Sequence, residues 1–187
     1  MIRAVIVGLG ALAAFASFAA SAGDAPASEE GVKAFADVYR VLQSPRCVNC
    51  HPNGDVPHVG DDHHVHAMEV RRGLEQVGMS CQTCHRATAT FASRQVGAPP
   101  AVPKWGLPPA ETPMVFEGKS AHDLCEQMKD PAKNGGKDAA ALHDHVANDA
   151  IVAYGWNPGG HRTLPPITHD AFVAAMSTWL NAGMPCP

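Results

Sequence analysis

The sequence has no excess of positive charge and, beyond Ala22, no long apolar run. Fourteen Lys and Arg residues stand against 18 Asp and Glu residues, which gives a formal net charge of −4. Because nucleic acids and anionic membrane surfaces are bound through basic patches, this balance argues against both kinds of partner. The alternating pattern of β-strands is also missing, so the sequence predicts a mainly α, loop-rich fold in one compact domain.

The segment 1–22 has the features of a secretory signal. Arg3 supplies a positive start, residues 4–20 are apolar and uncharged, and residues 20–22 read Ala-Ser-Ala, a form that signal peptidase cuts. An uncleaved membrane anchor is the alternative, but the apolar run is at the short limit for crossing a bilayer. We therefore expect residues 1–22 to be removed, and residues 23–187 to form a soluble domain in the periplasm or an equivalent compartment.

Cysteine and histidine recur together in one short pattern. The sequence reads Cys47-Val48-Asn49-Cys50-His51 and, further on, Cys81-Gln82-Thr83-Cys84-His85. This C-x-x-C-H pattern is typical of covalent haem c attachment. Two thiols at that spacing can add to the two vinyl groups of one porphyrin, and the histidine that follows can bind the iron as proximal ligand. The sequence thus predicts two haem c groups, with His51 and His85 as proximal ligands.

Two other kinds of site use the same cysteine spacing. One is a thioredoxin-like redox dithiol, and the other is a zinc site with four thiolate ligands. Neither explains why a histidine directly follows the second cysteine of both motifs. The stretch of chain from Cys47 to Cys81 is too short to enclose a haem in a domain of its own. We therefore expect the two haems to lie close together and to form a large part of the core of a single domain.

Cys125 and Cys186 belong to no motif. In an oxidising compartment, the two cysteines that remain outside the motifs are expected to form one disulfide. It would tie the last residues to a helix that begins near Ser120, and would stabilise the fold through the long loop that it closes. Two separate buried thiols are the alternative.

Helix signals occur at several places along the chain. At three of these places a capping Ser or Thr precedes apolar residues at helical spacing. Gly183 is expected to end the last helix. The stripe Val32, Phe35, Tyr39 and Leu42 is expected to face the core. The proline-rich segment 97–113, with Trp105 inside it, is expected to lie extended over the core. The predicted helices run from Ser28 to Gln43, Ser120 to Pro131, Lys137 to Tyr154 and Thr168 to Gly183.

The distal ligands decide whether an iron can bind anything else. The best candidate is His145, because it lies three residues after Leu142 and next to Val146, so that a helix turns it inward. His143 should then point to water. The second candidate is His66, which lies between the two motifs.

The histidine-rich segment 58–66 leaves alternatives open. His63 could be the ligand in place of His66, and the two share a face if the segment is helical. The histidines could also bind copper or zinc at a separate site, or form a solvated polar loop. Two histidines at each iron would lower the redox potential relative to a histidine–methionine pair. The methionine alternatives are Met68, Met79 and Met114.

Several segments together resemble a known family. Over nearly all of residues 23–187, the chain is similar to the small exported dihaem cytochromes c often labelled as an isoquinoline 1-oxidoreductase subunit. The resemblance implies electron transfer beside a molybdenum hydroxylase, with His66 and His145 at ligand positions. The chain itself has no molybdopterin or iron–sulfur motif. The segments that carry the resemblance are the two motifs, Gly54-Asp55, Gly60-Asp61-Asp62, Val70-x-Arg72-Gly73, Lys129-Asp130-Pro131, Asn134-Gly135-Gly136-Lys137, Asp149, Tyr154-Gly155-Trp156, Trp179 and Met184-Pro185-Cys186-Pro187.

The sequence therefore predicts a one-electron relay and not an enzyme. It would accept electrons from a periplasmic dehydrogenase, such as a molybdenum hydroxylase, and pass them to a cytochrome or an oxidase. The rival hypothesis is a dihaem enzyme of the peroxidase type, which needs an open iron with an acid–base residue over it. Glu117, His122 and Glu126 are the candidates for that residue. A haem-based sensor with an open iron is a third hypothesis.

Overall fold

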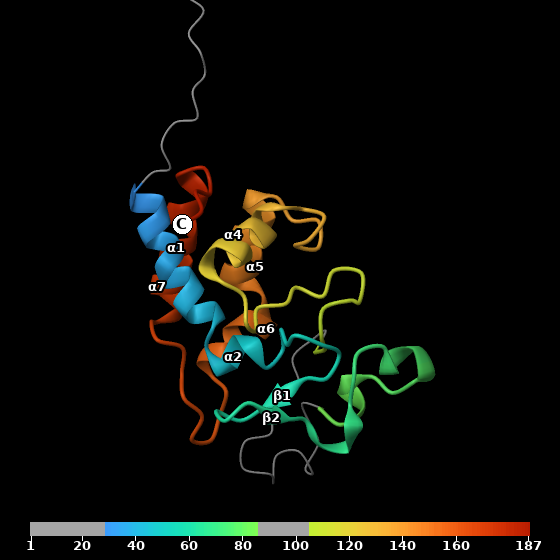
Figure 1. The fold of residues 1–187 in the computed structure, drawn as a ribbon. Helices are drawn as coiled ribbons and strands as arrows, with labels where there is room; N and C mark the ends of the chain where they lie inside the picture. The colour runs from blue at the N-terminus through green and yellow to red at the C-terminus, as the bar shows by residue number, and fades with distance from the viewer. Residues whose placement is uncertain (1–28, 86–104) are drawn as a thin grey trace, which may run out of the picture.

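The computed structural model describes residues 29–85 and 105–187 (Figure 1). The predicted signal and the capping Ser28 lie outside these ranges. Within them the fold is mainly α, as predicted, and the two strands have only two residues each. No helix in the described ranges is long and apolar enough to cross a membrane. The elements are α1 (Glu29–Leu42), α2 (Pro45–Val48), β1 (His58–Val59), β2 (His64–Val65), α4 (Ala121–Lys129), α5 (Ala139–Asn148), α6 (Ala150–Ala153) and α7 (His169–Asn181), with short 3-10 turns between them.

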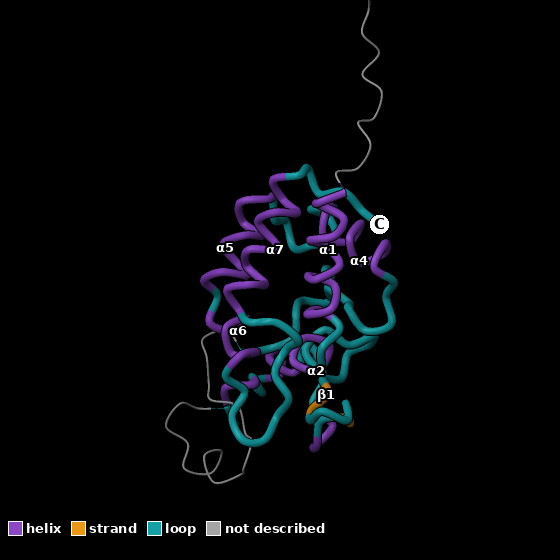
Figure 2. Tube along the Cα trace, turned by 90° about the vertical axis from the view of Figure 1, so that its left-hand side faces the viewer, coloured by secondary structure: helices purple, strands orange, loops and turns teal. Residues whose placement is uncertain are grey.

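Two helices from distant parts of the sequence form the centre of the core. α1 and α7 lie side by side (Figures 1 and 2). The rings of Phe35 and Trp179 lie 5.0 Å apart between them, and both side chains are fully buried. The predicted stripe of α1 is confirmed at Phe35 and Leu42, whereas Val32 and Tyr39 are only half-buried. The buried face is centred on the side of the helix that faces α7.

α7 begins and ends where the sequence predicts. Thr168 Oγ1 accepts a hydrogen bond from the Ala171 N–H at 3.2 Å, and Gly183, with φ of +83°, follows its end. A Cβ atom at Gly31 would lie 2.6 Å from Ala182 Cβ. Glycine at this position therefore lets the start of α1 pass close to the end of α7.

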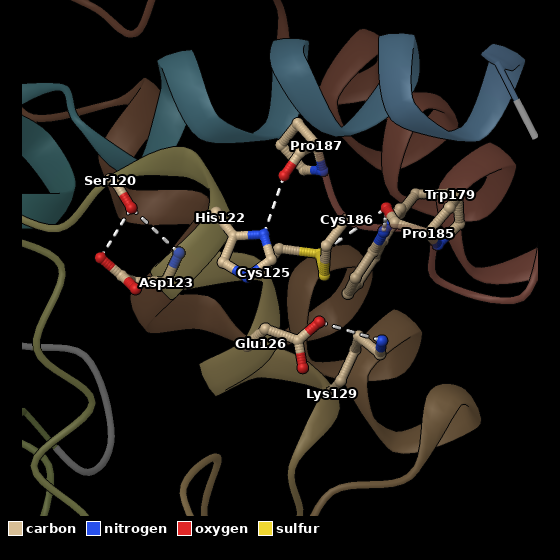
Figure 3. The surroundings of a disulfide bond; sticks show 10 residues. All are labelled: Ser120, His122, Asp123, Cys125, Glu126, Lys129, Trp179, Pro185, Cys186 and Pro187. Carbon is tan, nitrogen blue, oxygen red and sulfur yellow. Dashed lines mark hydrogen bonds and ion pairs between the residues drawn. A yellow bond between two sulfur atoms is a disulfide. The ribbon is translucent and has the colours of Figure 1, made fainter. Parts of the chain in front are cut away.

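A disulfide joins α4 to the end of the chain (Figure 3). Cys125 and Cys186 are bonded across a sequence separation of 61 residues, as the sequence predicted. Ser120 caps α4, because its side chain accepts a hydrogen bond from the Asp123 N–H. The indole N–H of Trp179 donates to the Pro185 carbonyl at 3.0 Å, so the disulfide lies against the α1–α7 core.

The region from 137 to 154 is not one helix, and that prediction is wrong. Asp149 has extended backbone angles, with φ −76° and ψ +125°, and it separates α5 from α6. Its carboxylate accepts a hydrogen bond from the Ile151 N–H and so begins a new helix. α5 itself starts at Ala139, two residues later than expected, because the Asp138 carboxylate accepts from the Ala141 N–H and caps it.

The segment between the two cysteine motifs lies at the other end of the molecule from α4 and α7 (Figure 1). β1 and β2 pair in antiparallel fashion, with His58 opposite Val65. The histidine-rich segment is therefore a short hairpin, and the suggestion that His63 and His66 share a helical face is wrong. No residue from Asn53 to His85 is buried. This stretch of the chain has no hydrophobic core of its own.

Candidate functional site

The first cysteine motif is a tight turn that α2 begins. Pro45 stands at the start of α2, where its missing N–H costs no hydrogen bond. The N–H groups of Cys50 and His51 then donate to the Cys47 carbonyl at 3.1 and 3.0 Å. This turn brings both thiols and the imidazole of the motif to one place.

The thiols of the first motif do not have the character of a redox dithiol. Neither Cys47 nor Cys50 forms a disulfide. Burial raises the pKa of Cys47 to about 12 and that of Cys50 to about 11. Redox-active cysteines have lowered thiol pKa values. Cys81 also contributes to the raised pKa of Cys50, which puts the second motif close to the first.

His51 is held by the segment 114–117, far along the chain. Its Nδ1 lies 2.7 Å from the Met114 carbonyl oxygen. Because a carbonyl only accepts, Nδ1 carries the proton, and Nε2 of the neutral ring is left as a lone-pair donor for a metal. The ring stacks on Phe116 at a centroid distance of 3.8 Å, and the N–H groups of Phe116 and Glu117 donate to the His51 carbonyl. The Met114 carbonyl therefore lies on the Nδ1 side of His51.

The surroundings of His51 keep it uncharged. Burial lowers its pKa to about 4, and repulsion from His145, Arg72 and Lys137 acts in the same direction. A histidine that stays neutral through the physiological range is ready to bind a metal. His145 therefore acts electrostatically on His51, although the two lie far apart in the sequence.

His145 projects from the side of α5 that carries the buried Leu142 and Val146. Its Nδ1 lies 3.2 Å from Asp149 Oδ2, so the carboxylate accepts the Nδ1 proton and leaves Nε2 available. Burial lowers the pKa of His145, with Lys137 next in effect. His143 is half-buried and lines a shallow, open hollow between α5 and α7.

The second cysteine motif is a 3-10 turn, Cys81–Thr83, and the His85 N–H donates to the Cys81 carbonyl at 2.9 Å. The His85 ring has two aromatic neighbours. Trp105 lies 5.5 Å away between ring centres, and His66 lies 6.1 Å away with its plane at 67°. His66 Nδ1 lies 2.7 Å from the Ala67 carbonyl oxygen, so this nitrogen donates and Nε2 is left as a lone-pair donor. The two candidate ligands thus lie beside different motif histidines.

Polar contacts fasten the segment between the motifs. Arg72 is half-buried as a residue, but its side chain is only 5% exposed, and it donates to the Asp55 carboxylate at 2.9 Å and to the carbonyls of Gly54 and Pro108. Trp105 contacts Tyr154 edge to face at 4.9 Å, so the described part of the proline-rich segment lies between the second motif and α6. Residues 97–104 of that segment lie outside the described ranges.

The three acid–base candidates do not lie together. His122 Nδ1 lies 2.8 Å from Pro187 O, and Glu126 pairs with Lys129 at 3.2 Å, both beside the disulfide (Figure 3). Only Glu117 lies beside a cysteine motif, where its N–H donates to the His51 carbonyl. The other methionine alternatives, Met68 and Met79, are largely exposed.

Sequence reasoning missed one cluster in part. His58, His63 and Glu117 bring one nitrogen or oxygen atom each within 4.8 Å of one another. The histidines were noted as a potential metal site, but Glu117 was considered only as an acid–base residue. It lies 54 positions from His63, and no short-range pattern connects the two. Comparison of the chain with protein-family models, curated proteins and solved structures finds no match.

Proposed function

We propose that this chain is an exported electron-transfer protein that carries two covalently attached haem c groups in the periplasm. The observation that carries the proposal is that the ring of His66 lies beside that of His85, with centres 6.1 Å apart. For the first motif, the support is that the charge of His145 acts on His51 and lowers its pKa. In His51, His145 and His66 the Nδ1 atom is engaged by a carbonyl or a carboxylate, which leaves Nε2 to bind a metal.

The ring centres of His66 and His85 lie 6.1 Å apart, so the two imidazoles are close enough for both to hold one haem iron. We therefore assign His85 and His66 to one haem iron, with Cys81 and Cys84 as the attachment cysteines.

The first haem would be attached at Cys47 and Cys50, with His51 and His145 as the iron ligands. Arg72 and Lys137 both lower the pKa of His51, so two cations lie near this site. Haem propionates are anionic, and such cations suit them. Asp149 would orient His145 and increase its basicity as a ligand.

A porphyrin would also explain how the segment between the motifs is ordered. From Asn53 onward this segment exposes several large apolar side chains and has no buried residue, although an ordered segment normally needs apolar burial to offset its lost entropy. A haem is a large apolar surface attached to the chain at that place. The haems would thus form much of the core at this end of the domain. The exposed side chains are Val65, Met68, Val77 and Met79.

Two histidines at each iron favour a relay over an enzyme. When bound, each haem supplies one-electron redox chemistry at an iron that has no free position. The proximity of the motifs, through Cys50 and Cys81, would keep transfer between the haems short. The partners we propose are a periplasmic dehydrogenase as donor, of which a molybdenum hydroxylase is one type, and a cytochrome or oxidase as acceptor.

The test is a set of optical and EPR spectra of the purified protein, oxidised and reduced, with and without carbon monoxide, beside a mass measurement of the intact chain. We expect the mass of two covalent haems, low-spin signals from both irons and no spectral change with carbon monoxide. A mass without haem would overturn the proposal. A high-spin iron that binds carbon monoxide would replace the relay by the peroxidase or sensor alternative.

A further inference from the structure

Three side chains converge beside the first cysteine motif in an arrangement that haem attachment does not use. His58 lies in β1, His63 directly precedes β2, and Glu117 is the last residue of the segment 114–117 that holds His51. His58 Nδ1 lies 2.8 Å from His63 Nε2, and His63 Nε2 lies 3.0 Å from Glu117 Oε1. All three side chains are half-buried, so the cluster is enclosed but open to water on one side.

The protons of His63 can be placed from its partners. The Asn49 side-chain amide donates from Nδ2 to the Gly60 carbonyl, which fixes Oδ1 as the atom facing His63 Nδ1. Oδ1 only accepts, so Nδ1 of His63 carries a proton. In a neutral ring Nε2 then has a lone pair and no proton. That lone pair faces the Glu117 carboxylate, which can accept hydrogen bonds but cannot donate one.

The Glu117 carboxylate is oriented by the backbone, because the Asn53 N–H donates to Oε2 at 2.7 Å. Oε1 is left to face His63. His63 Nε2 also lies 2.8 Å from His58 Nδ1, which can donate a proton to it. The imidazole nitrogen and the carboxylate, 3.0 Å apart, are therefore held together by the proton of His58, by a second proton on His63 or by a metal ion.

We propose that His58 Nδ1, His63 Nε2 and Glu117 Oε1 form a binding site for a divalent transition metal of the zinc type. Two imidazole nitrogens and one carboxylate oxygen are a zinc ligand set that leaves a fourth position for water. With metal–ligand bonds of about 2.0 Å, tetrahedral ligand atoms lie about 3.3 Å apart. The two short distances need to open by only a few tenths of an ångström, and the half-exposed side chains have room to do so.

The groups behind the ligands support a built site. Asn49 fixes the tautomer of His63, and Asn53 fixes the carboxylate of Glu117. Such outer partners orient metal ligands and typically contribute about 10- to 100-fold to affinity. His63 also has a left-handed backbone, with φ of +58°, which is uncommon in a residue other than glycine. Both asparagines lie within or next to the first cysteine motif, so the metal would clamp the hairpin to that motif and to Glu117.

The test is zinc binding by the full, purified chain, measured by equilibrium dialysis against Zn²⁺ buffered with a competing chelator. The wild type should bind one more Zn²⁺ per chain than the variants His58→Ala and His63→Ala. Glu117→Gln, which keeps the size of the side chain, should weaken the binding of that ion by about 10-fold or more. His64→Ala is the matched control, because His64 is the neighbouring exposed histidine and pairs only with Asp62 in the described structure.

A second measurement guards against variants that fail to fold. Zn²⁺ should raise the thermal unfolding midpoint of the wild type and of His64→Ala, and should raise that of Glu117→Gln less at the same Zn²⁺ concentration. Any zinc bound by the motif cysteines or by other histidines is the same in all variants and cancels in the comparison. Equal binding by the wild type, His63→Ala and Glu117→Gln, or equal loss in His64→Ala, would overturn the proposal.

Discussion

The imidazole rings of His66 and His85 lie with their centres 6.1 Å apart and their planes at 67°. His66 is one residue after β2, and His85 ends the second cysteine motif. The hairpin therefore determines where His66 lies, because the Pro57 carbonyl accepts a hydrogen bond from the His66 N–H at 2.9 Å. The proposed ligand pair depends on this short element, which buries none of its residues.

Replacing His66 by alanine should open one of the two irons. The expected result is a high-spin signal from one haem and a carbon monoxide complex at that haem alone, because His85 would remain as its only protein ligand. EPR and difference spectra with carbon monoxide measure both effects. His64→Ala is the control within the same hairpin. Identical spectra of His66→Ala and the wild type would rule out His66 as a ligand.

Asp149 makes a second, independent test at the other iron. It accepts the Nδ1 proton of His145 at 3.2 Å and also caps α6 through the Ile151 N–H. Asp149→Asn keeps an oxygen for the cap but removes the charge behind His145. A less basic histidine stabilises the oxidised iron less, so the midpoint potential of one haem should rise. A redox titration followed in the visible spectrum measures the shift.

Asp144→Asn is the control for the loss of one charge on the same helix. Asp144 accepts from the Asn148 side chain and makes no hydrogen bond to His145. Removing the charge of Asp144 should shift the midpoint potential of that haem less than Asp149→Asn does. Equal shifts in the two variants would mean that Asp149 acts only as a distant charge, and that His145 is not held by it as a ligand.

Short-range signals in the sequence predicted the elements whose causes are local. Ser120 and Thr168 begin helices because a hydroxyl three residues before a free N–H is sufficient to cap it. Asp149 also caps a helix, α6, through its side chain. The helical spacing of apolar residues from Leu142 to Val152 continues across Asp149, however, so the sequence predicts a single helix where the structure has two. Two-residue strands such as β1 and β2 are too short to leave an alternating pattern.

Long-range relationships at the candidate site could not be read from the sequence. The motifs specify which residues come together within a single turn of chain, but not that the Met114 carbonyl meets His51 or that Glu117 meets His63. Each of these contacts joins positions that are distant in the sequence, through a segment with few regular elements. The pairing of His145 with His51 and of His66 with His85 likewise follows only from the folded chain.

The disulfide should be the largest single contribution to the stability of the helical end. Joining Cys125 to Cys186 across 61 residues restricts the unfolded chain, and the loop-entropy relation gives about 4 kcal/mol. The double variant Cys125→Ala/Cys186→Ala should therefore unfold at a markedly lower denaturant concentration. Urea titration followed by circular dichroism measures the free energy of unfolding.

Reduction of the wild type provides the comparison for that variant. It removes the same crosslink without changing the packing of the side chains, so the reduced wild type and the double variant should lose similar stability. A loss below about 1 kcal/mol in both would contradict an entropic role for this crosslink. At the same oxidation state of the iron, the visible spectrum of the double variant should match that of the wild type, since the disulfide lies beside α4 and not at the cysteine motifs (Figure 3).

Ser120 should contribute stability that depends on pH. Its oxygen accepts from the Asp123 N–H at 3.1 Å, and its hydroxyl donates to the Asp123 carboxylate at 2.6 Å. The latter bond is the main reason that the pKa of Asp123 lies below its ordinary value. A carboxyl with a lowered folded-state pKa stabilises the fold above the unfolded pKa of about 3.9, and this contribution is lost as the pH falls further.

Ser120→Ala should accordingly destabilise the chain by about 1 kcal/mol near neutral pH, the usual cost of losing a helix cap. The difference from the wild type should shrink below about pH 4, because the protonated Asp123 no longer gains from the hydroxyl. Ser80→Ala is the control, since Ser80 also precedes a short helix but makes no capping bond with its side chain. Chemical unfolding at neutral and at acid pH tests this. A difference between wild type and Ser120→Ala that grows toward acid pH would mean that the hydroxyl favours the protonated carboxyl, contrary to the lowered pKa.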